Sequence, residues 1–180
     1  MAVKNPWHDV KAHEESPKVV KAIIEIPKDS SVKYELDKET GMLMLDRFLY
    51  SAVHYPGDYG FVPQTLWDDN DPLDIIVLTG RPVYPMTLAC VRVIGVLRMI
   101  DGDESDDKII GVYNQDPRFN EFTDLKDIPE HSLKELKSFF EKYKQLQGKT
   151  CQVPQIEGRE EAMKAIERSQ KMYQDKYGKK

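Results

Sequence analysis

From Val19 to Val112 the sequence is a succession of short β-branched and aromatic runs separated by Pro, Gly and Asp. Runs with this punctuation predict strands rather than helices. After Tyr113 the pattern changes, because apolar residues recur at three- and four-residue spacing until a helix stop at Gly148. A second helix is predicted over 159–177, before Gly178. The predicted strands are Val19–Ile26, Val32–Leu36, Met42–Leu49, Tyr59–Val62, Asp74–Leu78, Thr87–Met99 and Lys108–Tyr113.

Many short strands followed by two helices predict an α+β fold, with a closed barrel of strands and the helices packed outside it. A length of 180 residues suits a single domain. Within it we expect an N-terminal extension over 1–18, a mostly β region over 19–113 and a mostly helical region over 124–178.

The composition excludes several classes of protein. A formal net charge of −5 argues against a nucleic-acid binder, whose affinity depends on Lys and Arg neutralising phosphates. No apolar run approaches the ~20 residues that a membrane span needs. Cys90 and Cys151 are far apart and form no CxxC pattern, so neither a zinc site nor a disulfide framework is indicated. The first ten residues lack the apolar core of a signal peptide, and a cytoplasmic protein is therefore expected.

The predicted strand Met42–Leu49 is mostly apolar on both faces, which predicts cover on both sides. Arg47 then lies in an apolar context, where an unpaired charge is costly, and Glu25 has the same difficulty within AIIEIP. Two interpretations stay open: an ion pair between Arg47 and Glu25 at the barrel end, or a role in a site. Lys33 and Glu35 share one strand face, and taken alone they favour a solvated face.

Two acidic clusters each lie at a strand end. Asp69, Asp71 and Asp74 surround Pro72, which predicts a turn that leads directly into the aliphatic run IIVL. Like charges held this close repel one another unless a cation lies among them. The second cluster, DGDESDDK over 101–108, would on its own be a solvated loop.

Clusters of carboxylate oxygens suit Mg²⁺, Mn²⁺ or Ca²⁺. The calcium-loop pattern fails from both Asp69 and Asp101, because neither has Gly at the sixth position and Glu at the twelfth. The segment GKT, over 148–150, lacks the first glycine of a phosphate-binding loop. What remains is a pair of acidic loops that could share metal ions.

The segment DNDPLD, from Asp69 to Asp74, resembles the signature of the family I soluble inorganic pyrophosphatases: an Asp, a small residue, Asp-Pro, an aliphatic residue and Asp. Asn70 stands where Gly is usual, and Asn tolerates a positive φ better than most residues. Other segments follow in the order of the family, and the resemblance covers nearly all of 23–149. These segments are IEIP, KYELDKETG, DRFL, YPGDYGFVPQTL, IGVLRMID and FFEKYK.

The resemblance implies an inorganic diphosphatase, which hydrolyses pyrophosphate to two orthophosphates. It implies a five-stranded barrel of the oligonucleotide-binding (OB) type, with additional strands and two main helices packed outside. It also implies several Mg²⁺ ions per active site, with Mn²⁺ or Zn²⁺ as substitutes, and a homo-oligomer, of which a hexamer is the expected form.

The resemblance further implies roles for individual residues. Asp69, Asp74 and Asp106 would hold the tightest metal ion, with Asp74 bridging to a second ion. Asp101 and Asp106 would hold a further ion, and Asp71 would be the general base. The residues that would contact phosphate oxygens are Lys33, Arg47, Tyr59, Lys108, Tyr143 and Lys144. Glu25 and Glu35 would line the opposite wall and hold an ion through water.

Other interpretations remain open at this point. Tyr143 lies on the apolar stripe of its helix, where a packed aromatic residue is the default. Asp68, Asp103 and Asp107 match no ligand position of the family and are expected to be solvated neighbours. The function could be hydrolysis of another phosphoanhydride, in polyphosphate or a nucleotide, or a non-enzymatic OB-type barrel could bind single-stranded nucleic acid. The acidic composition opposes the last of these, which needs a basic groove with stacking aromatic residues.

Overall fold

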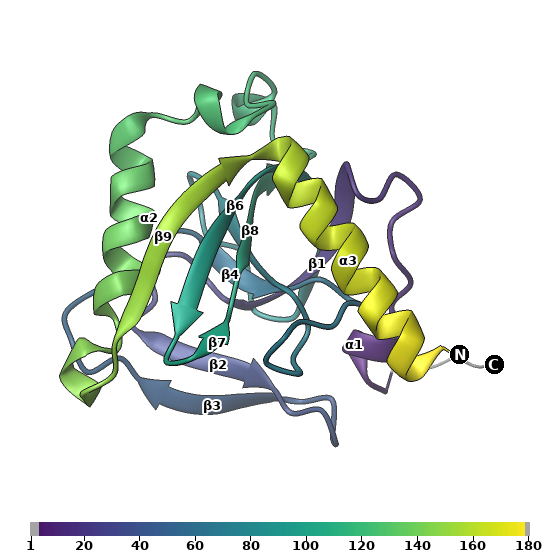
Figure 1. Ribbon diagram of the computed structural model, residues 1–180, viewed down its shortest axis with the longest axis horizontal. Helices are drawn as coiled ribbons and strands as arrows, with labels where there is room; N and C mark the ends of the chain where they lie inside the picture. The colour runs from purple at the N-terminus through teal and green to yellow at the C-terminus, as the bar shows by residue number, and fades with distance from the viewer. Residues whose placement is uncertain (1–3, 179–180) are drawn as a thin grey trace.

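Five strands close into a ring in the computed structural model, which describes residues 4–178 (Figure 1). In order around the ring they are β1 (Val19–Ile26), β4 (Asp58–Phe61), β5 (Asp74–Leu78), β8 (Lys108–Tyr113) and β6 (Thr87–Asp101). The ring is closed because β6 also pairs with β1. Only the β5–β8 pair is parallel, and the others are antiparallel. The expected five-stranded core of an α+β fold is thereby confirmed.

The long strand β6 pairs with strands that the sequence did not predict. Its N-terminal half pairs with β1, and its C-terminal half pairs with β9 (Cys151–Gly158). At its end it turns back into the short β7 (Glu104–Ser105). β9 was not predicted from the sequence, and its segment CQVPQIEG contains both Pro and Gly. β9 widens the sheet on one side and connects the two long helices (Figure 1).

The two predicted helices are present. α3 covers Arg159–Tyr177, as predicted, and α2 covers Glu130–Lys142, followed by a separate 3-10 turn and by Gly148 with a φ of +72°. None of the helices in residues 4–178 has the length and apolar character that a bilayer crossing requires. The shorter helical elements are α1 (Pro6–Asp9), η1 (Pro117–Phe119), η2 (Leu125–Asp127) and η3 (Gln145–Gln147).

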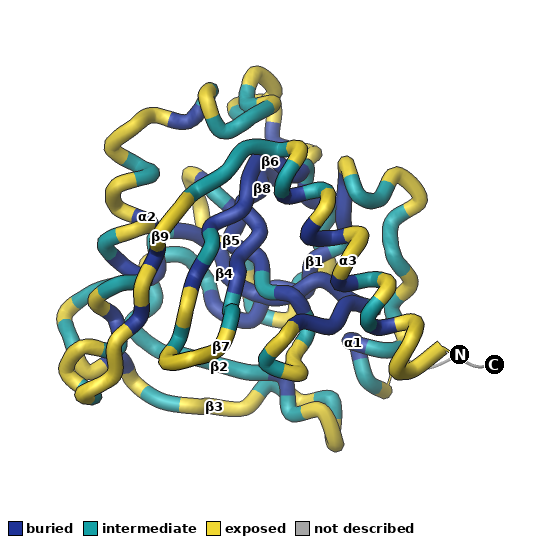
Figure 2. The backbone as a smooth tube through the Cα atoms, viewed as in Figure 1, coloured by how far each residue is buried: buried dark blue, intermediate teal, exposed yellow. Residues whose placement is uncertain are grey.

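Ile75, Ile76 and Val77 of β5 are buried, and their side chains alternate between the two faces of the ring (Figure 2). Ile75 and Val77 belong to a cluster that includes Ile166 of α3, whereas Ile76 belongs to a cluster that includes Phe140 of α2. A strand that is covered on both faces needs a continuous apolar run, which explains why IIVL does not alternate with polar residues. The acidic turn before β5 is therefore attached to a rigid part of the core.

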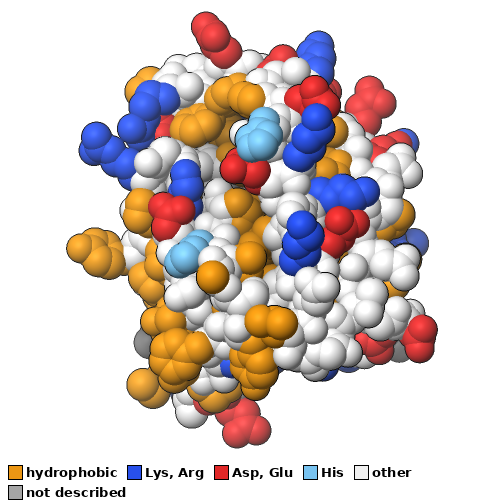
Figure 3. Space-filling view, turned by 90° about the vertical axis from the view of Figure 1, so that its left-hand side faces the viewer, with side chains coloured by type: hydrophobic (Ala, Val, Ile, Leu, Met, Phe, Trp, Pro, Cys, Tyr) orange, Lys and Arg blue, Asp and Glu red, His pale blue; other side chains and the backbone are white. Residues whose placement is uncertain are grey.

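The expectation that 42–49 is covered on both sides is wrong. β2 (Val32–Leu36) and β3 (Leu43–Phe48) form a separate two-stranded sheet outside the ring. Met44, Leu45 and Phe48 are 50%, 51% and 64% exposed. In Figure 2, β3 is coloured mostly as exposed or intermediate. Figure 3 views the left-hand side of Figure 1 and shows hydrophobic side chains gathered in its lower half. The side chains of β3 are mostly apolar, as its sequence indicates, but among the described residues β3 pairs only with β2.

Gly60 of β4 lies against β1 with no room for a side chain. A Cβ atom at this position would lie 1.9 Å from the Ile23 carbonyl oxygen of β1. We therefore expect Gly60→Ala to lower the free energy of unfolding by about 1–3 kcal/mol, the usual cost of overpacking. Gly80→Ala is the matched control, since the nearest atom to its Cβ is 4.0 Å away. Urea unfolding of the metal-free variants would contradict this expectation if both showed the same midpoint.

Candidate active site

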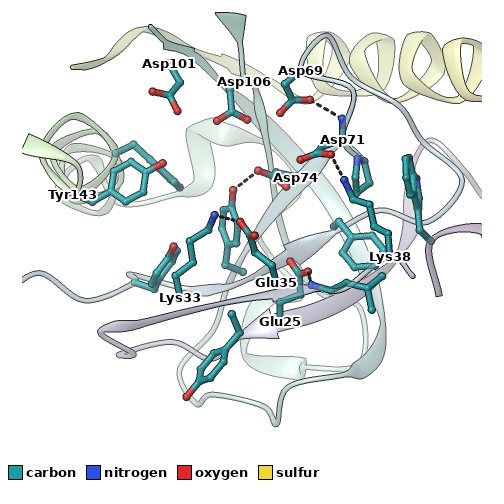
Figure 4. Close-up of a pocket in the computed structure, with 18 of the residues that line it drawn as sticks. Glu25, Lys33, Glu35, Lys38, Asp69, Asp71, Asp74, Asp101, Asp106 and Tyr143 are labelled. Atoms are coloured by element: carbon teal, nitrogen blue, oxygen red, sulfur yellow. Dashed lines mark hydrogen bonds and ion pairs between the residues drawn. The ribbon is translucent and has the colours of Figure 1, made fainter. Parts of the chain in front are cut away.

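A cavity of about 240 Å³ lies between the ring, the β2–β3 sheet and the C-terminal end of α2 (Figure 4). Aspartates occupy one side of it, and Lys33, Glu35 and Glu25 face them from the other side. Most of the residues predicted for the site line this cavity: Glu25, Lys33, Glu35, Tyr59, Asp69, Asp71, Asp74, Asp101, Asp106, Tyr143 and Lys144. Arg47 and Lys108 are not part of the lining, although both lie beside residues that are.

The acidic turn before β5 adopts the conformation that its sequence predicts. Asn70 has a φ of +67°, which Asn tolerates better than most residues. The Asp71 amide donates to Asp69 Oδ1 at 3.0 Å, and the Trp67 amide donates to the Asp71 carbonyl oxygen at 2.8 Å. These bonds fix the turn so that Asp69 and Asp71 both face the cavity. Burial and the charges of Asp74 and Asp106 raise the pKa of Asp69 to about 6.

Lys108 lies beneath the aspartates rather than at the cavity wall. Its side chain is 1% exposed, and its ammonium forms ion pairs with Asp74, at 2.6 Å, and with Asp106. The parallel register of β5 and β8 places Asp74 directly opposite Lys108, which explains this contact. Tyr59 also donates its hydroxyl to Asp74, and burial keeps the pKa of Tyr59 well above its ordinary value. Tyr59 therefore remains a neutral donor at any physiological pH.

The second acidic cluster contributes Asp101, at the end of β6, and Asp106, just before β8. Lys144, directly after α2, forms an ion pair with Asp101. Burial acts to raise the pKa of Asp101, but the hydrogen bond and the charge of Lys144 outweigh it and lower that pKa. Tyr143 is only 6% exposed and stacks on Phe139, so it is both a core residue and part of the cavity wall.

Glu25 and the pair Lys33–Glu35 form the opposite wall (Figure 4). Glu25 is buried, and its Oε1 accepts a hydrogen bond from the Leu36 amide at 2.7 Å. The proposed ion pair between Glu25 and Arg47 is wrong, because Arg47 pairs with its neighbour Asp46 on β3. The Nε of Arg47 is buried and has no hydrogen-bond partner among the described residues.

Glu25 should make the stability of the metal-free chain depend on pH. Burial raises its pKa from 4.5 to about 8, so the folded chain retains a proton that the unfolded chain releases. The stability that this proton provides is complete below pH 4.5 and is lost as the pH rises to about 8. Glu25→Gln keeps an acceptor for Leu36 but carries no charge. We therefore expect the Tm of Glu25→Gln minus the Tm of the unsubstituted chain to increase from pH 5 to pH 9.

Thermal unfolding in a chelator at several pH values measures this difference. Glu39→Gln is a suitable control, because Glu39 is an exposed residue of the turn between β2 and β3. Its Tm difference should stay constant over the same range. A difference for Glu25→Gln that is equally constant would contradict the expected titration.

The donor set of the cavity suits a hard divalent cation. Five aspartates offer only oxygen ligands, which Mg²⁺ prefers. Asp69 has no ion-pair partner among the described residues, although it lies among like charges that raise its pKa. Within residues 4–178 no three Asp, Glu, His or Cys side chains converge on one point as a finished metal cage would. Mg²⁺ retains several of its waters and needs only one or two carboxylates, so this spacing is compatible with it.

Trp7 and Lys38 also line the cavity, although neither was predicted as a site residue. Lys38 forms an ion pair with Asp71, and its ammonium lies 5.2 Å from the centre of the Trp7 ring. Lys38 lies within the segment KYELDKETG, where no spacing or pattern distinguishes it from a solvated turn residue. Trp7 belongs to the N-terminal extension, which carried no functional signal. Asp68 and Asp107, which were expected to be solvated neighbours, do not line the cavity. Asp68 pairs with Arg168 at the surface. For Asp107 the expectation is wrong, because it is 4% exposed and pairs with Arg98.

Comparison with known proteins identifies relatives along nearly the whole chain. The family model for inorganic pyrophosphatase matches residues 22–174. Soluble inorganic pyrophosphatase 2 of Chlamydomonas reinhardtii is 49% identical over 173 residues, which are 96% of this chain and 90% of that protein. Soluble inorganic pyrophosphatase 1 of Arabidopsis thaliana is 46% identical over 169 residues, which are 94% of this chain and 80% of that protein.

Solved structures of inorganic pyrophosphatases have the same fold as this chain. The inorganic pyrophosphatase from Thermus thermophilus superimposes with a TM-score of 0.91 at 39% identity, and covers 94% of this chain and 99% of its own. The enzyme from Helicobacter pylori superimposes with a TM-score of 0.88, also at 39% identity, over 93% and 99% of the two chains. With a family model that spans most of the sequence and relatives of this similarity, the chain belongs to the inorganic pyrophosphatase family.

Proposed function

We propose that this chain hydrolyses inorganic pyrophosphate to two orthophosphates, and that the acidic cavity is where it does so. The observation that carries the proposal is the arrangement of that cavity, which is lined by five aspartates and also by Lys33 and Lys144. Pyrophosphate is a polyanion, and its hydrolysis depends on neutralising charge and on positioning a water in line with the leaving phosphate.

We assign the carboxylates two different tasks. Asp69, Asp74, Asp101 and Asp106 would hold Mg²⁺ ions, for which Mn²⁺ or Zn²⁺ could substitute. When bound, such ions lower the pKa of water and stabilise the charge on attacking and leaving oxygens. Asp71 would accept the proton of the attacking water. Its side chain is 55% exposed, against 24% for Asp74 and 17% for Asp106, so it can pass that proton to solvent.

The cationic and phenolic side chains would bind the phosphate oxygens. Lys33 and Lys144 pair with Glu35 and Asp101 at the cavity wall, and phosphate oxygens can take the place of these partners. Arg47 does not line the cavity, but it lies opposite Lys33 on the paired strands β2 and β3, from where its guanidinium would reach the phosphate oxygens. Lys108, Tyr59 and Tyr143 complete the proposed set, with Lys108 acting from beneath Asp74 and Asp106. Glu25 and Glu35 would hold a further ion through water.

A cytoplasmic location and a homo-oligomer, expected to be a hexamer, are part of the same proposal. Both cysteines are free, which suits a reducing compartment. The exposed apolar side chains of β3 support self-association, because monomers rarely expose such patches. Light scattering of the purified chain measures the oligomeric state directly.

The substrate is tested by comparing pyrophosphate, tripolyphosphate and ATP at one Mg²⁺ concentration. A cavity of about 240 Å³ suits the smallest of the three. We expect kcat/KM for pyrophosphate to exceed the other two by at least about 10²-fold, as in sites where a poor fit leaves polar groups unpaired. Equal or greater kcat/KM for ATP or tripolyphosphate would contradict the proposed substrate.

A further inference from the structure

Lys38 connects the β2–β3 turn to the acidic turn. Its ammonium forms an ion pair with the carboxylate of Asp71 across the mouth of the cavity (Figure 4). The two side chains are 43% and 55% exposed, and an exposed pair of this kind contributes only about 0–1 kcal/mol to stability. Lys38 is, however, the only described residue that donates a hydrogen bond to the Asp71 carboxylate. The orientation of that carboxylate therefore depends on Lys38.

Two residues of the N-terminal segment, Trp7 and Asn5, contact Lys38. The ammonium lies 5.2 Å from the centre of the Trp7 ring, a cation–π distance. The Asn5 side-chain amide donates to the Lys38 carbonyl oxygen at 2.8 Å. A lysine side chain has several rotatable bonds, and an exposed one normally samples many rotamers. Contacts at both its backbone and its ammonium restrict this one to the direction of Asp71.

Trp7 is also fixed to the loop that carries the acidic turn. It is 4% exposed, and its indole Nε1 donates to the Thr65 carbonyl oxygen at 2.7 Å. The Thr65 hydroxyl in turn accepts from the Leu73 amide at 2.9 Å and donates to the Val62 carbonyl oxygen, so it spans the residues on either side of the turn. Trp7 thus contacts the Lys38 ammonium directly and, through Thr65, the loop that carries Asp71.

The backbone of the β2–β3 turn packs directly against the backbone of the N-terminal segment. Gly41 has a φ of +72°, and a Cβ atom there would lie 2.0 Å from the Lys4 carbonyl oxygen. No side chain fits between these two segments. The distance between the turn that carries Lys38 and the loop that carries Asp71 is therefore set by the residues around Trp7.

We propose that Lys38 is a positioning residue for Asp71, and that Trp7 holds Lys38 in place, so that the segment Lys4–Asp9 is a working part of the active site. This inference rests on the proposed function, in which Asp71 is the general base. Lys4–Asp9 precedes residue 22, where the match to the family model begins. Lys38 acts by keeping the Asp71 carboxylate directed into the cavity, because an aspartate on an exposed turn otherwise rotates toward solvent.

The first test is the variant Lys38→Gln, which removes the charge from an exposed side chain and should fold normally. We expect kcat to fall about tenfold with KM nearly unchanged, since misplacing a reacting group lowers the rate without weakening substrate binding. Lys38→Arg should retain most of the rate. Lys164→Gln is the control, because it also removes an exposed ion pair, with Glu161 of α3, and neither residue lines the cavity. Mn²⁺ affinity, measured by titration, should change by less than about threefold in Lys38→Gln.

The second test is a double-mutant cycle with Asp71→Asn. If Lys38 acts through Asp71, adding Lys38→Gln to Asp71→Asn should leave the residual rate within about twofold, because coupled residues are not additive. An unchanged kcat in Lys38→Gln, the same tenfold loss in both backgrounds, or a tenfold change in Mn²⁺ affinity would each overturn the positioning role. Full activity of Asp71→Asn alone would instead show that Asp71 is not the general base. That outcome contradicts the proposed function and is distinct from the outcomes that test Lys38.

Trp7 is tested with two variants whose Tm is measured alongside the kinetics. Trp7→Phe keeps an aromatic face for the ammonium and should lose less than about threefold in kcat, whereas Trp7→Leu should approach the loss of Lys38→Gln. In the Lys38→Gln background neither change should lower kcat further. Equal losses for Phe and Leu, or a further loss in that background, would show that Trp7 does not act through Lys38.

Discussion

Replacing Asp71 by Asn should lower kcat for pyrophosphate hydrolysis near neutral pH by on the order of 10²–10⁴-fold, the usual contribution of a general base. Asn has the same shape as Asp and can still accept a hydrogen bond from Lys38, but it cannot take a proton from water. Because Asp71 is not among the proposed ligands of the tightest metal ion, Mn²⁺ should still bind. Phosphate release and Mn²⁺ titration on the same preparation separate these two effects.

Asp68→Asn is the matched control for this experiment. Asp68 lies on the same loop, but its carboxylate pairs with Arg168 of α3 at 2.6 Å and is not part of the cavity lining. Its loss should change kcat by less than about twofold, as expected for an exposed ion pair. If Asp71→Asn were as active as Asp68→Asn, another group would have to accept the proton.

Asp74→Asn is expected to remove metal binding as well as activity. Asp74 lies at the start of β5, where it accepts hydrogen bonds from Tyr59 and, at 2.6 Å, from Lys108. Even the loss of a group that only supports a metal ligand costs about 10–100-fold in affinity, so loss of a proposed ligand should cost at least that much. We expect a similar or greater loss of kcat/KM, because the ions supply most of the charge stabilisation in such sites.

The control is Asp103→Asn, in the exposed loop between β6 and β7. It removes one carboxylate from the second acidic cluster without touching the cavity lining. Mn²⁺ affinity in this variant should equal that of the unsubstituted chain. The assignment of Asp74 as a ligand would be wrong if Asp74→Asn bound Mn²⁺ as tightly as Asp103→Asn does.

The sequence predicted the elements of the fold better than their partners. α3 was predicted over its whole length, because its apolar spacing is regular and Gly178 follows it. β3 was predicted as a strand, but periodicity shows only that its residues are apolar, not that they lie outside the ring. β9 was missed because its pairing with β6 depends on the length of β6, which extends past β1 to accept a second partner.

The same limit explains which parts of the site were predictable. Asp69 and Asp74 are close in sequence, and Pro72 makes the turn between them visible. Asp74 and Lys108 come together only because β5 and β8 pair in parallel, which no local pattern encodes. Lys38 and Trp7 come from two distant segments, and each has an ordinary local context. Only the packing of the N-terminal segment against the β2–β3 turn brings them to Asp71.

Phosphate release from pyrophosphate, measured as Mg²⁺ is added to chelator-treated protein, tests the central claim most directly. We expect no turnover before Mg²⁺ is added, and then a rise in rate to a plateau, with two phosphates released per pyrophosphate consumed. In the proposed site the carboxylates hold the ions and the lysines bind the phosphates, and neither set should suffice alone. Turnover that is independent of divalent ions, or folded protein that stays inactive at saturating Mg²⁺, would contradict the claim.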